Sequence, residues 1–144
     1  RSPTFPESEV ELEQRLTLQA IRSQQEQPFT VAIDKLRHAM YGDHPYAMSG
    51  LGTEESVSQL TRQDLQAYYQ THFRPDNLII SIAGRIAPGD AIALVQEVFG
   101  DWKAPNTPLP TLNLPEITPK PNRVLTPQDT QQSIVILGYL APSI

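Results

Sequence analysis

Cysteine is absent from the 144 residues. The chain can therefore have no disulfide, no thiolate nucleophile and no cysteine-ligated metal, although nothing follows about its redox compartment. No apolar run approaches the ~20 residues that a membrane-spanning helix needs. No charged-then-apolar leader opens the chain. Since the chain begins at Arg1 without a methionine, we expect it to be an excised piece of a longer protein.

Basic residues are also scarce. The chain has 11 Lys and Arg against 16 Asp and Glu, a formal net charge of -5. This balance argues against nucleic acid as the main partner, because a phosphate backbone selects basic surfaces. A hydrophobic fraction of 39% and a charged fraction of 19% describe a soluble globular protein, long enough for one domain with a core. The compartment stays open between cytoplasm and periplasm.

The sequence contains no self-contained catalytic motif. Its histidines are His38, His44 and His72, and no two have the i, i+4 spacing that places two imidazoles on one helix face for zinc. HExxH, HxxEH, G-x-S-x-G and the glycine-rich phosphate loops are all missing. His44 could act as a general acid or base, but a His-Pro in a loop more often organises the backbone. Gly50 and Gly52 most simply supply turn dihedrals.

Apolar spacing and capping signals predict a helical chain. Phe29, Ala32, Ile33, Leu36 and Met40 form one apolar stripe, which Gly42 closes. Thr61 and Asp64 are spaced as a capping pair. The predicted helices cover about 6–25, 29–41, a short turn within 52–60, about 62–73 and 88–99.

Two apolar runs, residues 77–84 and 132–140, predict strands covered on both faces, and residues 123–126 predict a weaker one. Six prolines between residues 103 and 121 indicate an extended linker. We therefore predict an α+β fold divided into 1–102, the end of one α/β domain, a linker at 103–122, and 123–144, the start of a second domain. The sheet neighbours of these strands are expected outside this chain.

One long stretch carries a resemblance to a known family. "HPYAMSGLGTEESVSQLTRQDLQAYYQTHFRPDNLIISIAG", His44 to Gly84, resembles the pitrilysin/insulinase-type zinc peptidases, and most closely the bacterial proteins similar to mitochondrial processing peptidase. The shared order is a His-Pro, a Gly-Thr-Glu loop, a Leu-Thr followed by an acidic-Leu helix, and a Pro-x-Asn strand that ends in Gly. "VFGDW" and "TQQSIVILGY" also fit, so the resemblance covers nearly the whole chain.

The resemblance implies the two-domain α/β half of an inverted-zincin peptidase, in which two halves enclose a chamber for peptides. It also implies zinc held by the two histidines of HxxEH, a glutamate between them as general base, and a distal glutamate as third ligand. HxxEH would lie upstream of Arg1. The distal glutamate should lie within this chain, seven residues after another glutamate.

Aligning that pattern with "EVELEQRLTLQAIR" puts the first glutamate at Glu13 and the distal ligand at Ala20. Seven residues are about two helical turns, so both positions lie on one face. The methyl group of Ala20 cannot bind zinc, and Gln19 would point about 100° away. The resemblance therefore indicates no catalytic residue and no metal ligand in this chain. Glu13 or Glu11 is the fallback ligand if the alignment is slipped.

The favoured hypothesis is a non-catalytic partner subunit that helps form a peptide-binding chamber. The alternatives are a fragment of an active zinc endopeptidase and a structural or assembly subunit. The expected partners are a zinc-bearing homologous subunit or the missing remainder of the chain, together with a peptide substrate. Zinc would belong to the full-length protein or its partner. The Arg and Tyr with which partner subunits bind substrate carbonyls would follow Ile144. The motif residues are assigned structural roles: His44, Pro45, Gly50, Gly52, Thr53, Pro75, Asn77 and Gly84.

Overall fold

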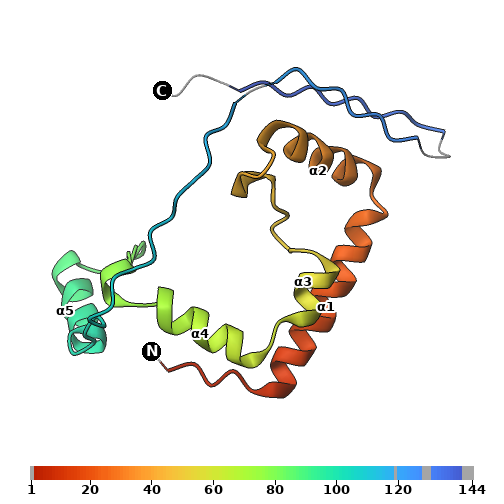
Figure 1. Cartoon of the computed structure of the whole chain (residues 1–144). Helices are drawn as coiled ribbons and strands as arrows, with labels where there is room; N and C mark the ends of the chain where they lie inside the picture. Colours follow the sequence, from red (N-terminus) through yellow and green to blue (C-terminus); the bar gives the residue numbers. More distant parts are fainter. Residues whose placement is uncertain (1, 119, 128–130, 141–144) are drawn as a thin grey trace. The chain divides into compact units, whose positions relative to one another are not determined.

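The computed structural model describes residues 2–118, 120–127 and 131–140. Their regular structure is helical (Figure 1). The α-helices are α1 (Glu7–Gln25), α2 (Pro28–Tyr41), α3 (Glu54–Gln59), α4 (Arg62–His72) and α5 (Pro88–Phe99), and the two 3₁₀ turns are η1 (Pro45–Ala47) and η2 (Pro75–Asn77). Each predicted helix is thus confirmed, within one or two residues at the longer helices' ends.

The chain forms two compact units. Unit 1 consists of Arg1–Leu60 and Leu112–Ile144, and unit 2 consists of Thr61–Thr111. Unit 1 therefore contains α1, α2, η1 and α3 together with the late extended segments, and unit 2 contains α4, η2 and α5. Each unit is described by itself below.

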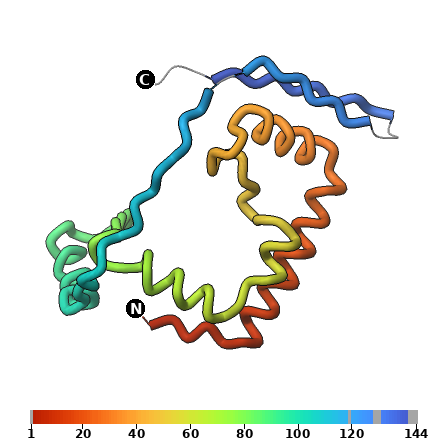
Figure 2. Tube along the Cα trace, in the orientation of Figure 1, coloured from red at the N-terminus to blue at the C-terminus, as the bar shows by residue number. Residues whose placement is uncertain are grey.

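In unit 1, α3 lies along α1 (Figures 1 and 2). Gln14, in the middle of α1, bonds to carbonyls at the end of α3, whereas Arg22, near the end of α1, pairs with Glu54 at the start of α3. The order of contacts is reversed along the two helices, so they are antiparallel. The buried apolar residues are Ile21 on α1, Val57 on α3 and Ala47 in η1.

The late extended segments of unit 1 lie against α2. Residues 115–118 and 120–122 line a hollow with Ala39–His44. Further along, a Cβ atom added at Gly138 would overlap Sδ of Met40 and would lie 3.0 Å from Cδ1 of Leu36. The backbone at Gly138 therefore approaches α2 more closely than a residue with a side chain could without repacking.

Local side-chain contacts set several helix boundaries. The Thr53 hydroxyl accepts from the Ser56 N–H and the Ser56 hydroxyl accepts from the Thr53 N–H, which forms a capping box at α3. Thr61 and Asp64 make the same reciprocal pair at α4. The capping pair predicted for α4 is therefore confirmed.

A tight turn ends α2. Gly42 has φ 54° and ψ -119°, the angles of the first central position of a type II′ turn. The His44 N–H donates to the Tyr41 carbonyl at 2.9 Å and closes that turn, while the Gly42 N–H donates to the His38 carbonyl. A side chain at φ 54° is strained whatever space surrounds it, so this position requires glycine.

We expect Gly42→Ala to lower the free energy of unfolding by about 1–2 kcal/mol, because alanine resists the positive φ of this turn. Gly89→Ala is the matched control: Gly89 lies in the first turn of α5 with nothing near its missing Cβ, and alanine should be neutral there or stabilise by up to about 1 kcal/mol. Urea unfolding of both variants measures the difference. A neutral Gly42→Ala would contradict the turn assignment.

The α+β prediction is not supported, because no strand is formed in the residues that the structure describes. Asn77 belongs to η2, and residues 78–83 and 131–140 have no ladder partner. A strand is defined by hydrogen bonds to a neighbour, so an apolar run that is suited to a sheet stays unassigned without one. The weaker strand at 123–126 is likewise not formed. That the missing neighbours lie outside this chain stays a prediction.

The expected core is also thinner than the sequence pattern suggests. Phe29, which begins the predicted buried stripe of α2, is 62% exposed, and the other members of that stripe are only half-buried. On α5, Ile92 is exposed, while Val95 and Phe99 are half-buried. The helices are amphipathic, but their apolar faces are mostly not covered within the described residues.

Among the described residues, no helix combines the length and the apolar character required to cross a bilayer.

The division of the chain into two domains joined by a linker at 103–122 stays a prediction. Residues 119, 128–130 and 141–144, which belong to the predicted linker and second domain, lie outside the described residues.

Candidate functional site

The helix that should carry the distal zinc ligand is continuous. α1 runs from Glu7 to Gln25 without a break, so positions 13 and 20 lie about two turns apart on one face. Ala20 is half-buried there, and Glu13 and Glu11 are exposed. No cluster of three or more acidic or histidine side chains that could hold a metal ion is found in the described part of the chain.

A neighbouring face of α1 holds α3 at both ends. The Gln14 side-chain amide donates to the Val57 carbonyl at 2.8 Å and lies 3.2 Å from the Leu60 carbonyl, at the end of α3. At the other end, the Arg22 guanidinium lies 2.9 Å from Glu54. Both groups of that pair are largely exposed, so the pair orients α3 more than it stabilises it.

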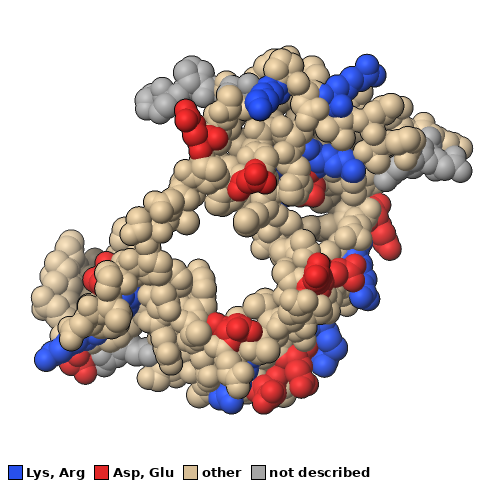
Figure 3. All heavy atoms as spheres, in the orientation of Figure 1, with Lys and Arg blue, Asp and Glu red and all other residues tan. Residues whose placement is uncertain are grey.

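A cleft of about 840 Å³ opens in unit 1 between the end of α1, α2 and the loop that leads into α3. Its charged wall is on α2, where Asp34 pairs with Arg37 at 2.9 Å and lies 3.8 Å from Nε2 of His38. Thr53 and Glu54 form part of the opposite wall. Charged side chains of both signs are interspersed over the face of α1 drawn in Figure 3, with no gathered basic patch in that view.

The His44–Pro45 loop is an ordered structural element. His44 is 5% exposed, and its Nδ1 accepts a hydrogen bond from the Tyr46 N–H at 3.1 Å. This bond caps η1, whose first residue is Pro45. The His44 ring also meets Tyr46 edge-on at 4.7 Å between centroids, and Tyr41 meets Tyr46 edge-on at 5.7 Å. Nδ1 is therefore already engaged with the backbone.

The other motif residues of unit 1 build the entry to α3. Gly52 has φ 77°, and a Cβ there would lie 3.0 Å from the Ser56 hydroxyl. Thr53 follows as the N-cap of α3. Gly50 lies in the preceding turn at a negative φ and has open space where a Cβ would be. Only Gly52 of the two glycines therefore occupies a backbone conformation that side chains avoid.

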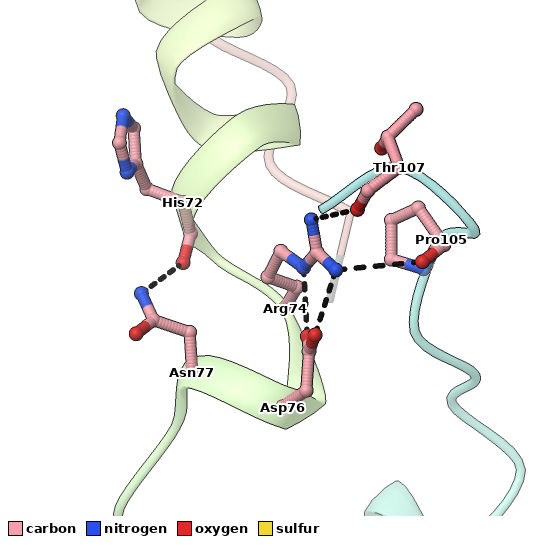
Figure 4. Close-up of polar contacts among 6 residues, drawn as sticks. All are labelled: His72, Arg74, Asp76, Asn77, Pro105 and Thr107. Atoms are coloured by element: carbon pink, nitrogen blue, oxygen red, sulfur yellow. Dashed lines mark hydrogen bonds and ion pairs between the residues drawn. The ribbon is translucent and has the colours of Figure 1, made fainter. Parts of the chain in front are cut away.

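Pro75 and Asn77, two motif residues of unit 2, follow directly after a buried arginine, Arg74, whose polar contacts Figure 4 shows. Arg74, just before Pro75, is 4% exposed. Its Nε and Nη2 donate to the two carboxylate oxygens of Asp76 at 2.7 and 2.6 Å, and its Nη1 donates to the Thr107 carbonyl at 2.8 Å. Asn77 donates from its side chain to the His72 carbonyl at 3.0 Å. Gly84 is not part of this arrangement and has open space around it.

Two carboxyl groups of unit 2 are held in their charged form. The hydrogen bond from Arg74 lowers the pKa of Asp76 below its ordinary value of 3.8. The hydrogen bonds that Asp64 accepts from Thr61 lower the pKa of Asp64 in the same direction. The bond to Asp76 in turn raises the pKa of Arg74. Both carboxylates therefore support local structure rather than acting as proton donors near neutral pH.

The structure brings the predicted motif residues together as two structural junctions. His44, Pro45, Gly52 and Thr53 lie in unit 1, and Pro75 and Asn77 lie beside Arg74 in unit 2. Sequence reasoning missed Gln14, Arg74 and the two tyrosines that pack with His44. An arginine two residues before an aspartate hints at a local ion pair, but no sequence signal links Arg74 to a carbonyl 33 residues later.

The family model described as "Peptidase M16 inactive domain" matches residues 59–144. The chain is 30% identical over 136 residues to an uncharacterized zinc protease of Mycobacterium leprae, covering 93% of this chain and 31% of that protein. It is 33% identical over 93 residues to the "Probable mitochondrial-processing peptidase subunit beta" of Schizosaccharomyces pombe, covering 65% of this chain and 20% of that protein.

A solved structure is also similar. The peptidase M16 inactive domain from Pseudomonas fluorescens superposes with a TM-score of 0.71 at 26% identity, over 83% of this chain and 28% of that one. The chain thus spans between a fifth and a third of the length of these relatives. The resemblance seen in the residues and the similarity of the folds point to the same family.

Proposed function

Because the chain belongs to the peptidase M16 inactive domain family, we propose that its parent is a non-catalytic partner subunit of the processing-protease type, which helps to form a peptide-binding chamber. The chain itself is an inactive-domain segment of a zinc protease family protein. We also propose a peptide substrate and a zinc-bearing partner subunit for the parent.

The observation that carries this proposal is Ala20. The unbroken α1 keeps positions 13 and 20 on one face, so no kink or bulge shifts another residue into the place of the distal ligand. A methyl group offers zinc no lone pair. A catalytic zinc normally has three protein ligands, and one that has lost a carboxylate binds weakly or not at all.

The uncovered apolar faces support a role in assembly. Ile79 is 93% exposed and Val135 is 82% exposed. Exposing apolar side chains to water costs free energy unless another part of the polypeptide or a partner covers them. The covering chain is the remainder of the parent, a zinc-bearing homologous subunit, or both. Zinc is expected to be bound by the parent or by that subunit. The chamber is expected to bind an unstructured peptide.

We expect near-zero zinc in the full-length parent purified alone without added metal. Peptidase activity should be absent from the parent alone and should appear when a zinc-bearing homologous subunit is added. About one zinc per chain, together with activity on an unstructured peptide, would mean that the parent is an ordinary zinc endopeptidase, as the name of the mycobacterial relative suggests. Metal analysis and a peptide-cleavage assay measure both quantities.

Two substitutions separate a slipped alignment from the proposal. If Glu13 or Glu11 is the distal ligand, then Glu13→Gln or Glu11→Gln removes the bound zinc while leaving the helix intact. If the proposal holds, neither substitution changes the metal content. Glu9→Gln, in the first turn of α1, is the matched control. A parent that binds no zinc and restores no activity on mixing would instead be a structural or assembly subunit.

A further inference from the structure

The buried Arg74 joins two distant parts of unit 2. Its guanidinium binds Asp76 through two nitrogens, and the remaining contacts go to the carbonyls of Thr107 at 2.8 Å and Pro105 at 3.4 Å. Those carbonyls lie at the start of the proline-rich segment, 31 and 33 residues after Arg74. Figure 4 shows both carbonyl groups directed toward the guanidinium.

The proline-rich segment offers backbone carbonyls to such a donor. Prolines 105, 108 and 110 lack an N–H group, so this part of the chain cannot form a regular ladder or helix that would use its carbonyls. A guanidinium has five N–H groups in a fixed planar arrangement. Arg74 can therefore bind a carboxylate through one edge and backbone carbonyls through its other hydrogens.

Asp76 holds the Arg74 guanidinium in the orientation that binds these backbone carbonyls. The two bonds of 2.6 and 2.7 Å make a bidentate pair, which fixes the plane of the guanidinium as well as its position. Pro75 lies between the two residues and restricts the backbone that separates them. The η2 turn, Pro75–Asn77, follows at once. The pair that orients the arginine therefore joins residues only two apart and does not involve the proline-rich segment.

We propose that Arg74, oriented by Asp76, acts as a clamp that fixes residues 105–107 to unit 2, so that the proline-rich segment is held by unit 2 only as far as Thr111. The boundary of unit 2 at Thr111 fits this division. The segment 103–122 therefore has two parts: an anchored part that belongs to unit 2 and a following part that does not. Arg74 is a positioning residue for the connection between the two predicted domains.

Trypsin cleavage of the full-length parent tests the clamp. Lys103 precedes Ala104 and is a cleavable site at the anchored end, and Arg123 precedes Val124 and is a cleavable site beyond it. Lys120 precedes Pro121, and Arg74 precedes Pro75, so trypsin does not cut at either position. A protease must hold about four residues on each side of the cut in an extended form, which includes the clamped carbonyls.

We expect Arg74→Lys to raise the cleavage rate at Lys103 about tenfold, because a lysine cannot make the bidentate pair and bind the carbonyls together. The rate at Arg123 should not change. Asp76→Asn keeps the arginine but weakens its orientation, and it should give a smaller rise at Lys103. Arg85→Lys, an exposed arginine in the same unit, is the matched control and should alter neither rate.

Two outcomes would overturn the clamp. One is an unchanged rate at Lys103 in both the Arg74 and the Asp76 variants. The other is an equal rise at Lys103 and Arg123, which would mean that the substitution loosens the whole protein.

Discussion

As an isolated polypeptide the 144-residue chain is expected to self-associate, and in size-exclusion chromatography it should elute as oligomers whose size grows with concentration. The reason is its two uncovered apolar segments, residues 78–82 and 134–140, where Ile79 and Val135 are almost fully exposed. Extended apolar segments with unpaired backbone groups associate edge to edge. A monodisperse monomer at high concentration would count heavily against this prediction.

Single charges should reduce the association. Ile79→Lys and Val135→Lys each place an ammonium on one of the two segments, where pairing would have to desolvate it. The double variant should shift the oligomer towards monomer by about tenfold or more in concentration. Leu16→Lys, on the exposed part of α1, is the matched control and should leave the elution profile unchanged.

The second large effect is expected at Ile21. It is the buried residue of α1 and is 6% exposed, and α3 has six residues and depends on α1 for its stability. Ile21→Ala should lower the opening free energy of α3 by about 2–4 kcal/mol, the usual cost of truncating a buried isoleucine. This is a large share of the stability that a small domain has.

Hydrogen exchange at the amides of α3 in the full-length parent measures that loss. The expected result is that protection in α3 falls by about 1.5 to 3 orders of magnitude, while α4 and α5 in unit 2 keep theirs. Leu16→Ala removes a similar volume from the same helix at a position that is half exposed, and it should cost less than about 1 kcal/mol. Unchanged α3 protection in Ile21→Ala would contradict the assigned packing of α1 on α3.

Local features of this chain could be predicted from the sequence, and long-range features could not. The bounds of α5 and the capping pair of Thr61 and Asp64 follow from residues three or four apart. Gly42 marks the end of α2 for a local reason too, because its positive φ belongs to the turn that closes between Tyr41 and His44. Apolar periodicity identifies which faces of the helices are suited to burial, but it does not say whether the covering chain is present.

The strand predictions were wrong because the sequence pattern does not show whether a neighbouring strand is present. Residues 78–82 have the composition of a central strand, yet a strand also needs a neighbour for its backbone groups, and the described residues supply none. The candidate site shows the same limit. The roles of His44, Gly52 and Thr53 in their turns depend on residues within a few positions, whereas those of Gln14 and Arg74 depend on carbonyls 31 to 46 residues away.

The capping boxes at α3 and α4 have a consequence for how the parent is synthesised. Each box closes between residues three apart, so these helices can begin to form in about a microsecond, as soon as they leave the ribosome. α1, which is made before α3, packs against it, but the described residues do not cover the apolar segments at 78–82 and 134–140. We therefore expect a nascent chain in which the helix starts form early while its apolar segments stay open, a state that favours binding by chaperones until assembly is complete.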